Sequence, residues 1–209
     1  MPETLANLLC ELNEDEAMAQ VQDRLARGDD PLGIIEECRQ GMEIVGKRFE
    51  DKEYFITELI MAGEIFGDIM KELEPALKGR KAETVGKIVI GTVQGDIHDI
   101  GKNIVSTMLS CSGFEVFDLG VDVPPEKFVE KIKEVGAPLV GLSGLMTTSF
   151  NPMKETVEAI AKAGLRDKVK VLVGGGPVNE RVVEFVGADV FGKDVTTAIE
   201  LSRNYLGVK

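Results

Sequence analysis

The only histidine of the chain, His98, lies between two carboxylates, Asp96 and Asp99. A histidine that ligates a metal normally donates its second ring N–H to an acceptor such as a carboxylate, which fixes the tautomer and tunes the basicity of the ring. Asp96 is well placed for that role, so the segment is a candidate metal site. The commoner alternative for a single His-Asp pair is a surface loop in which Asp99 caps the next helix.

Two later segments are rich in small or hydroxylated residues. Residues 143–149 have the sequence SGLMTTS, and residues 174–177 have the sequence GGGP. The hydroxyls could contact a ligand, or Thr148 or Ser149 could cap a helix, and both roles can coexist. The glycines would let a ligand approach the backbone or would form a tight turn before a helix. Neither GxxxxGK[ST] nor GxGxxG follows a strand, which argues against a phosphate-binding loop.

The composition is that of an ordinary globular protein, with 44% hydrophobic and 29% charged residues among 209. The formal net charge of −12 repels nucleic acid and anionic membrane surfaces. No apolar run approaches the roughly 20 residues that cross a bilayer, and the first residues do not resemble a signal peptide. We therefore expect a cytoplasmic protein that binds neither nucleic acid nor membranes.

The three cysteines, Cys10, Cys38 and Cys111, are widely spaced and include no C-x-x-C pair. Such spacing suggests neither a disulfide framework nor a zinc site. We expect all three to be small apolar residues on helices.

Residues 1–80 carry helical periodicity and predict a small antiparallel bundle of about four helices. One helix is expected to end at Arg27-Gly28, a second to begin at Pro31 and end at Gly46, and a third to span residues 55–77. Residues 81–86 lose the apolar periodicity and become charged, as linkers between domains do.

Residues 87–209 alternate short β-branched runs with amphipathic helices, which predicts an α/β domain with a doubly wound, five-stranded parallel sheet of the flavodoxin or Rossmann-like kind. For five strands we favour the order 2-1-3-4-5, with the ligand site at the carboxyl ends of strands 1 and 3. The expected strands are residues 87–93, 114–120, 139–145, 170–176 and 188–192. The expected helices are residues 99–112, 125–135, 151–163, 179–186 and 195–205.

Taken together, the three segments resemble the cobalamin-binding domains of cobalamin-dependent methionine synthase and of the corrinoid proteins of anaerobic methyltransferase systems. The family pattern is D-x-H-x-x-G, then S-x-L, then G-G. The segments GDIHDIGKNIV, FDLGVDVPPEKFVE and GLSGLMTTSF are similar to the methionine synthase type, and family members also carry an N-terminal helix bundle of about this size. The pattern occurs here as Asp96-Ile97-His98-Asp99-Ile100-Gly101, Ser143-Gly144-Leu145 and Gly174-Gly175.

The resemblance implies a role for each matching residue. His98 should replace the cofactor's own dimethylbenzimidazole as the lower axial ligand of cobalt. Asp96 should be hydrogen-bonded to the imidazole, and Ser149 should come next in this chain of hydrogen bonds, or relay. Gly101 should permit close packing where the displaced nucleotide tail enters the domain. The residues expected to line the slot of the tail are Ser143, Leu145, Gly174 and Gly175. The other expected cofactor contacts are Gly95, Ile97, Asp99, Ile100 and Thr147.

The helix bundle of the family covers the upper face of the corrin and shields the reactive methyl group. Tyr54, Phe55, Glu58 and Leu59 are the candidates for that cap. The alternative is that they belong to the core or the surface of the bundle, since apolar stripes on helices are usually core.

The activity that the resemblance implies is methyl relay by a non-catalytic carrier component. A donor methyltransferase methylates cob(I)alamin on the carrier, and an acceptor methyltransferase then moves the methyl group of methylcobalamin to tetrahydrofolate or a thiol. A reductive activase is the third expected partner. Methanol, a methylamine, a betaine, a methoxylated aromatic and methyltetrahydrofolate all stay open as methyl donors.

Three other classes of protein share parts of this pattern. A cobalamin-dependent mutase subunit would need a barrel domain to hold its substrate, and 209 residues leave no room for one unless a second chain supplies it. A cobalamin-responsive regulator would need a helix-turn-helix and a basic face, whereas the N-terminal region is acidic. A flavodoxin-like signalling module would have no use for His98 or for the run of glycines.

Overall fold

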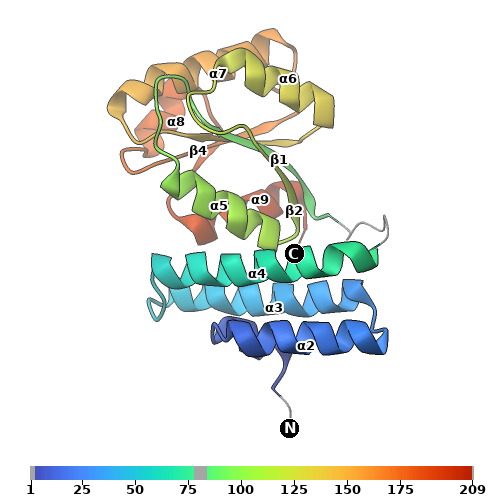
Figure 1. Ribbon diagram of the computed structural model, residues 1–209. Coiled ribbons are helices and arrows are strands. Elements are labelled where there is room, and N and C mark those ends of the chain that lie inside the picture. The colour runs from blue at the N-terminus through green and yellow to red at the C-terminus, as the bar shows by residue number, and fades with distance from the viewer. Residues whose placement is uncertain (1–2, 78–83, 209) are drawn as a thin grey trace. The chain divides into compact units, whose positions relative to one another are not determined.

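The computed structural model describes residues 3–77 and 84–208 (Figure 1). The chain divides into two compact units, a helical one of Met1–Glu83 and one built on a sheet, Thr84–Lys209, from which Cys111–Gly113 is grouped with the first. Of the predicted linker, residues 81–83 lie outside the described residues.

The helical unit has four helices in its described part, the number expected from the sequence. α2 begins with three acidic residues, which suit the positive end of the helix dipole. It ends at Arg27, as predicted, and its C-cap Gly28 has a left-handed φ of 84°. The helices are α1 (Leu5–Cys10), α2 (Glu14–Arg27), α3 (Pro31–Glu50) and α4 (Ile56–Leu77).

The predicted end of α3 at Gly46 is wrong, because the helix continues to Glu50. A glycine inside a helix costs only about 1 kcal/mol relative to alanine. The apolar face predicted for α3 is buried as a whole, so its packing outweighs that cost. The residues of this face are Ile34, Ile35, Cys38, Met42 and Val45.

The sheet of the second unit has five parallel strands in the order β2-β1-β3-β4-β5, which confirms the predicted topology. Its strands are β1 (Gly86–Thr92), β2 (Phe114–Asp118), β3 (Leu139–Ser143), β4 (Lys170–Gly174) and β5 (Val190–Gly192). The helices that connect or follow them are α5 (Ile100–Cys111), α6 (Pro125–Val135), α7 (Phe150–Lys162), α8 (Glu180–Val186) and α9 (Val195–Leu206).

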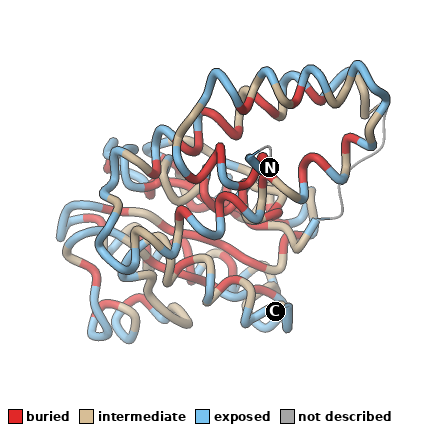
Figure 2. Tube along the Cα trace, turned by 90° about the horizontal axis from the view of Figure 1, so that it is seen from below, coloured by how far each residue is buried: buried red, intermediate tan, exposed pale blue. Residues whose placement is uncertain are grey.

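Helices cover both faces of this sheet, with α6, α7 and α8 on one and α5 and α9 on the other (Figure 1). Successive residues of β1 alternate between the two cores: Val89 packs under the first set of helices and Ile88 under the second. The three central strands, β1, β3 and β4, are accordingly buried through most of their length (Figure 2). A sheet covered on both faces exposes its strand ends, which is where polar chemistry can be placed.

The strand register brings the ends of the central strands into one row. Thr92 of β1 pairs with Ser143 of β3, and Ser143 pairs in turn with Gly174 of β4. The segments that follow these three residues therefore leave the sheet at the same edge. They are the three segments that the sequence singled out.

Candidate functional site

The segment between β1 and α5 carries His98 and starts with a tight turn. The amide of Asp96 donates to the carbonyl of Val93 over 3.1 Å, and Gly95 has a φ of 82°. A left-handed φ at the third position of a turn is the type II geometry, which favours glycine. The turn directs Asp96 into the protein and leaves His98 at the edge of the sheet.

Asp96 is fully buried, and one oxygen of its carboxylate holds His98. Oδ1 lies 2.7 Å from Nδ1 of the His98 ring and accepts a second hydrogen bond, 3.0 Å long, from the His98 backbone amide. Two bonds to one oxygen fix both the backbone and the ring of His98. The predicted pairing of Asp96 with the imidazole is therefore present in the structure.

The other oxygen of Asp96 is held from the segment that follows β3. Oδ2 accepts a 2.7 Å bond from the Ser149 hydroxyl and another of 2.7 Å from the amide of Leu145. Ser149 belongs to the short 3₁₀ turn Thr147–Ser149, directly before α7, but its hydroxyl makes no capping bond. Ser149 thus occupies the N-cap position of α7, but its hydroxyl is used by Asp96 and does not cap the helix.

The charge state of Asp96 follows from these contacts. Burial opposes ionisation, but hydrogen bonds from Ser149, from the amide and ring of His98 and from the amide of Leu145 outweigh it, so the pKa of Asp96 is well below its usual value. An ionised carboxylate can only accept, so Nδ1 of His98 carries a proton. In the neutral ring, a proton on Nδ1 leaves the free lone pair on Nε2. The His98 side chain is 49% exposed.

Two residues that the sequence interpretation missed also hold this segment. The Thr92 hydroxyl donates to the carbonyl of His98 over 2.9 Å. Asp122, in the loop after β2, accepts a bond of 2.7 Å from the amide of Gly95 and donates its own amide to the carbonyl of Asp96 over 2.9 Å. The ligand site was expected at the carboxyl ends of strands 1 and 3, whereas Asp122 follows strand 2.

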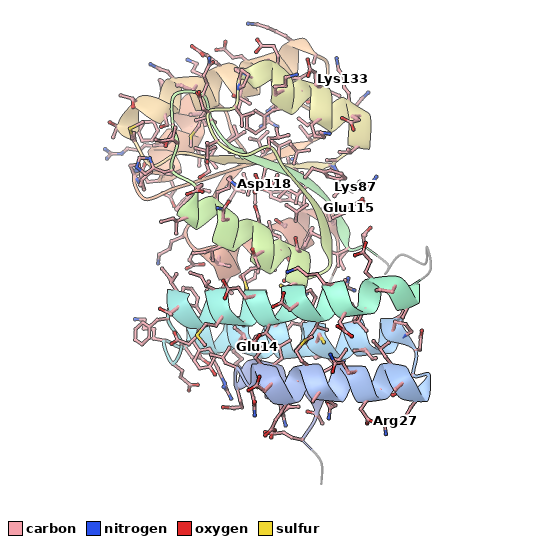
Figure 3. The ribbon with its side chains drawn as sticks, viewed as in Figure 1. Glu14, Arg27, Lys87, Glu115, Asp118 and Lys133 are labelled. Atoms are coloured by element: carbon pink, nitrogen blue, oxygen red, sulfur yellow. The ribbon has the colours of Figure 1, made fainter. Side chains whose placement is uncertain are left out.

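An ion pair between a buried lysine and an exposed aspartate fastens the start of α5. Lys102 is buried, and its ammonium group contacts Asp118 at the end of β2 and the side-chain oxygen of Asn103. Figure 3 shows Asp118 beside α5, where its carboxylate also accepts from Ser106. The pair ties the helix that follows His98 to the neighbouring strand.

The glycines after β4 meet the segment after β3 at very short range. The amide of Gly144 donates to the carbonyl of Gly174 over 3.1 Å. A Cβ built on Gly175 would lie 1.9 Å from the carbonyl oxygen of Gly144, so no larger residue fits there. The S-x-L and G-G segments are thus in direct contact, and Leu145 of the first segment is 49% exposed.

An unusual number of large apolar side chains around His98 are exposed. Ile97 and Ile100, on either side of it along the chain, are each 73% exposed. Exposed apolar groups gathered around a polar centre mark a ligand-binding or interaction surface. The others on this edge of the sheet are Val121, Leu145 and Met146.

The candidate cap residues of the helical unit lie in three different environments. Phe55 is exposed, and its amide donates to the carboxylate of Glu58 over 2.8 Å at the start of α4. The hydroxyl of Tyr54 donates to the carbonyl of Cys10 over 2.6 Å, so the ring is held within the unit. Leu59 is buried, which fits the alternative that it belongs to the bundle core.

Two family models, each described as a B12 binding domain, match the chain over residues 86–202 and residues 2–74. The chain belongs to the B12-binding family. Its cofactor is cobalamin, as the sequence motifs predicted, and the relay of His98, Asp96 and Ser149 lies within the first of the two matched ranges.

Relatives and solved structures agree with the family over almost the whole chain. The dimethylamine corrinoid protein of Methanosarcina barkeri is 42% identical over 207 residues, with 97% of this chain and 95% of that protein covered. A cobalamin-binding protein from Desulfitobacterium hafniense DCB-2 is 44% identical with a TM-score of 0.78, and 96% of each chain is covered. The methanol:cobalamin methyltransferase complex MtaBC from Methanosarcina barkeri gives 26% identity and a TM-score of 0.89, covering 99% of this chain and 79% of that one.

These comparisons confirm the predicted fold and the resemblance to corrinoid proteins of methyltransferase systems. Among the described helices of this B12-binding protein, none is long and apolar enough to cross a membrane. Within residues 3–77 and 84–208, no group of three or more His, Cys, Asp or Glu side chains could hold a metal ion.

Proposed function

We propose that this corrinoid protein carries a methyl group from a donor methyltransferase to an acceptor methyltransferase. When bound, cobalamin supplies a cobalt centre that takes up and releases the methyl group, and the protein supplies orientation and electrostatics. The observation that carries the proposal is the relay from Ser149 through the buried Asp96 to His98, at the strand ends of a B12-binding domain.

His98 is the residue that we assign as the axial ligand of cobalt. It offers a single nitrogen, Nε2, which would suit a metal that is held mainly by the ring of its own cofactor. The 49% exposure of its side chain and the exposed Ile97 and Ile100 suit a large, partly apolar ligand. The chemistry of the donor set and of its surroundings therefore fits cobalamin.

Asp96 and Ser149 would adjust the ligand strength of His98. Because Asp96 holds the proton on Nδ1, it makes Nε2 a better donor than a solvated imidazole would be. Ser149 shares the charge of Asp96 by donating to its second oxygen. A proton moved along this chain of hydrogen bonds would strengthen or weaken the axial ligand as the oxidation state of cobalt changes.

The small residues at the strand ends are our candidates for the slot of the nucleotide tail. No atom of the described residues lies within 4 Å of a Cβ built on Gly101, so the first turn of α5 has free space beside it. The residues proposed to line the slot are Ser143, Leu145, Gly174 and Gly175. The remaining contacts that we propose with the cofactor are Gly95, Ile97, Asp99, Ile100 and Thr147.

We retain the predicted division of the chain, with residues 1–80 as the cap, 81–86 as the linker and 87–209 as the cobalamin-binding domain. The shielding role of the cap rests on the family resemblance. Phe55 is the best candidate for contact with the cofactor because its side chain is 69% exposed. Tyr54 and Leu59 would support it from within the helical unit.

The names of the relatives bear on the partners. One relative is named for dimethylamine, and MtaBC is named as a methanol:cobalamin methyltransferase complex. We propose a donor methyltransferase of one of these two kinds as the first partner. An acceptor methyltransferase acting on a thiol or tetrahydrofolate, a reductive activase and a cytoplasmic location complete the proposal.

Isotope transfer tests the carrier role. The protein is loaded with cobalamin, reduced, and mixed with a dimethylamine or a methanol methyltransferase and substrate labelled in its methyl carbon. We expect the label first on the bound cofactor and then, after an acceptor methyltransferase is added, on its thiol or folate. Free cobalamin at the same concentration is the control. A loaded protein that exchanges methyl groups no faster than free cobalamin would show that it is not a carrier.

A further inference from the structure

The loop after β2 is bonded to the end of β1 more closely than a connecting loop needs to be. The amide of Leu119 donates to Ile90, the amide of Thr92 to Gly120, and the amide of Val123 to Thr92, over 2.8 to 3.0 Å. These bonds carry the pairing of the two strands beyond the end of β2 at Asp118. The loop is therefore a fixed frame beside the segment that holds His98.

Asp122 reaches from this frame to two successive residues of that segment. Its carboxylate accepts from the amide of Gly95 over 2.7 Å, and its amide donates to the carbonyl of Asp96 over 2.9 Å. The two bonds bracket Gly95 and Asp96 and limit rotation of the backbone between them. Gly95 needs this restraint most, because glycine has the widest conformational freedom.

The backbone of Asp122 is itself adapted to this contact. Its φ is 53°, in the left-handed region that few residues other than glycine adopt, although aspartate tolerates it better than most. A glycine at this position would adopt the same backbone without strain but would lack the carboxylate. The presence of aspartate points to a use for its side chain.

Asp96 is consequently held from two sides. The segment after β3 binds its carboxylate through Ser149 and Leu145, and Asp122 binds its backbone from the loop after β2. The 2.7 Å contact of Asp96 with Nδ1 of His98 requires both the side chain and the backbone to be in place. The bonds from Asp122 therefore add to the restraint that the turn and the Thr92 hydroxyl already place on this segment.

We propose that Asp122 is a positioning residue for the axial ligand, which acts by clamping Gly95 and Asp96 so that His98 is oriented before the cofactor binds. This inference rests on the proposed function of His98. It does not depend on the charge of Asp122, because the bonds need an acceptor oxygen and a backbone amide. An asparagine supplies both, and it also tolerates the left-handed backbone.

Three variants separate the clamp from other effects. Asp122→Gly removes the acceptor and keeps the backbone, and Asp122→Asn keeps the acceptor and removes the charge. Asp194→Gly is the matched control. It also removes an exposed carboxylate that accepts a hydrogen bond of 2.8 Å from a backbone amide. Asp194 lies between β5 and α9, at the edge of the sheet opposite β2. Urea unfolding is used to check that all three are folded.

Two readouts are compared at one pH. In the apoprotein, nitrogen-15 NMR of the only imidazole reports how firmly the proton is held on Nδ1. In the cobalamin-loaded protein labelled with nitrogen-15 histidine, the doublet splitting in the EPR spectrum of cobalt(II) reports the fraction coordinated by His98. We expect Asp122→Gly to lower the coordination equilibrium roughly tenfold and to mix the two tautomers. Asp122→Asn and Asp194→Gly should match the wild type in both readouts.

Unchanged NMR and EPR spectra in Asp122→Gly would overturn the clamp. An effect of the same size in Asp122→Asn or Asp194→Gly would also overturn it, because the loss of charge would then be the cause. If wild-type His98 does not coordinate cobalt, the proposed function fails, while the NMR spectra of the apoprotein still decide the role of Asp122.

Discussion

Ser149 donates a hydrogen bond of 2.7 Å to the carboxylate of Asp96, a residue 53 positions earlier in the chain. The bond joins the segments that follow β3 and β1, which are neighbours in the sheet. Asp96 is fully buried, so no water molecule replaces the hydroxyl without rearrangement. The state of His98 therefore depends on a contact that forms only when both strands are in register.

Removing members of this relay should weaken the axial ligand in a graded way. Asp96→Asn loses the ionised acceptor, and we expect coordination of His98 to weaken roughly 100-fold, whereas Ser149→Ala should weaken it about tenfold. The measurement is the visible spectrum of the bound cofactor, which is followed from the form in which His98 coordinates cobalt to the form in which it does not. Ser202→Ala is the matched control, because Ser202 is also buried and its hydroxyl donates over 2.7 Å to a carbonyl of its own helix. Equal spectra for Ser149→Ala and Ser202→Ala would disprove the relay.

Acid should remove the contribution of Asp96 to stability. Its pKa in the folded protein is below the ordinary value of 3.8, so the stabilisation is complete above about pH 4 and is lost as the pH falls toward the folded-state value. The free energy of unfolding of the wild type should approach that of Asp96→Asn as the pH is lowered, when both are measured by urea unfolding. Asp189 has a lowered pKa as well, but it is common to both proteins and cancels in the difference. A difference that does not change between about pH 7 and pH 3 would contradict this prediction.

Gly175 should not tolerate a side chain. In Gly175→Ala the new Cβ would lie 1.9 Å from the carbonyl oxygen of Gly144, and the φ of 129° is unfavourable for alanine. We expect a loss of about 3 kcal/mol in the free energy of unfolding, together with loss of cobalamin binding. Gly207→Ala is the control, since its φ is also positive but no described atom lies within 4 Å of the added Cβ. It should cost only about 1 kcal/mol, and equal losses in the two variants would contradict the close contact.

The three cysteines should be unreactive in the folded protein. All are buried, and burial raises the pKa of Cys38 to about 12, so its thiolate is scarce at neutral pH. Cys10 and Cys111 also have raised pKa values, again chiefly because of burial. We expect a thiol reagent at about pH 8 to label none of them until urea is added, and then all three. Rapid labelling of the native protein would contradict their assignment as core residues.

Much of the site could be predicted because parallel strands end at a common edge. Once β1, β3 and β4 were recognised, the segments carrying His98, Ser149 and Gly175 had to meet there. The motif also placed Asp96 beside the imidazole. What it could not supply was the burial of Asp96 and its hydrogen bonds, two on Oδ1 and three on Oδ2, which depend on the exact register of the strands.

The features that were missed depend on tertiary geometry. Asp122 lies 27 residues from Gly95 in the chain, and nothing in its local sequence shows that its backbone is left-handed or which amide it accepts from. The prediction that α3 ends at Gly46 failed for the opposite reason. Glycine is a local signal for a helix end, but packing of the buried face of α3 continues the helix past it. Local rules therefore place elements and edges, whereas the restraints on His98 appear only in three dimensions.

The assignment of His98 as the ligand of cobalt is the central claim, and the composition of the chain allows a direct test. Because His98 is the only histidine, growth on nitrogen-15 histidine labels one imidazole, provided that no histidine tag is used. The labelled protein is loaded with unlabelled cobalamin and reduced to cobalt(II), and its EPR spectrum is compared with that of unlabelled protein.

Nitrogen-14 splits each cobalt line into three and nitrogen-15 splits it into two. If His98 is the ligand, the triplets of the unlabelled protein become doublets in the labelled one. Triplets that persist after labelling would show that the cofactor's own base ligates the metal, and lines without nitrogen splitting would show that no imidazole does. Either result would contradict the assignment of His98.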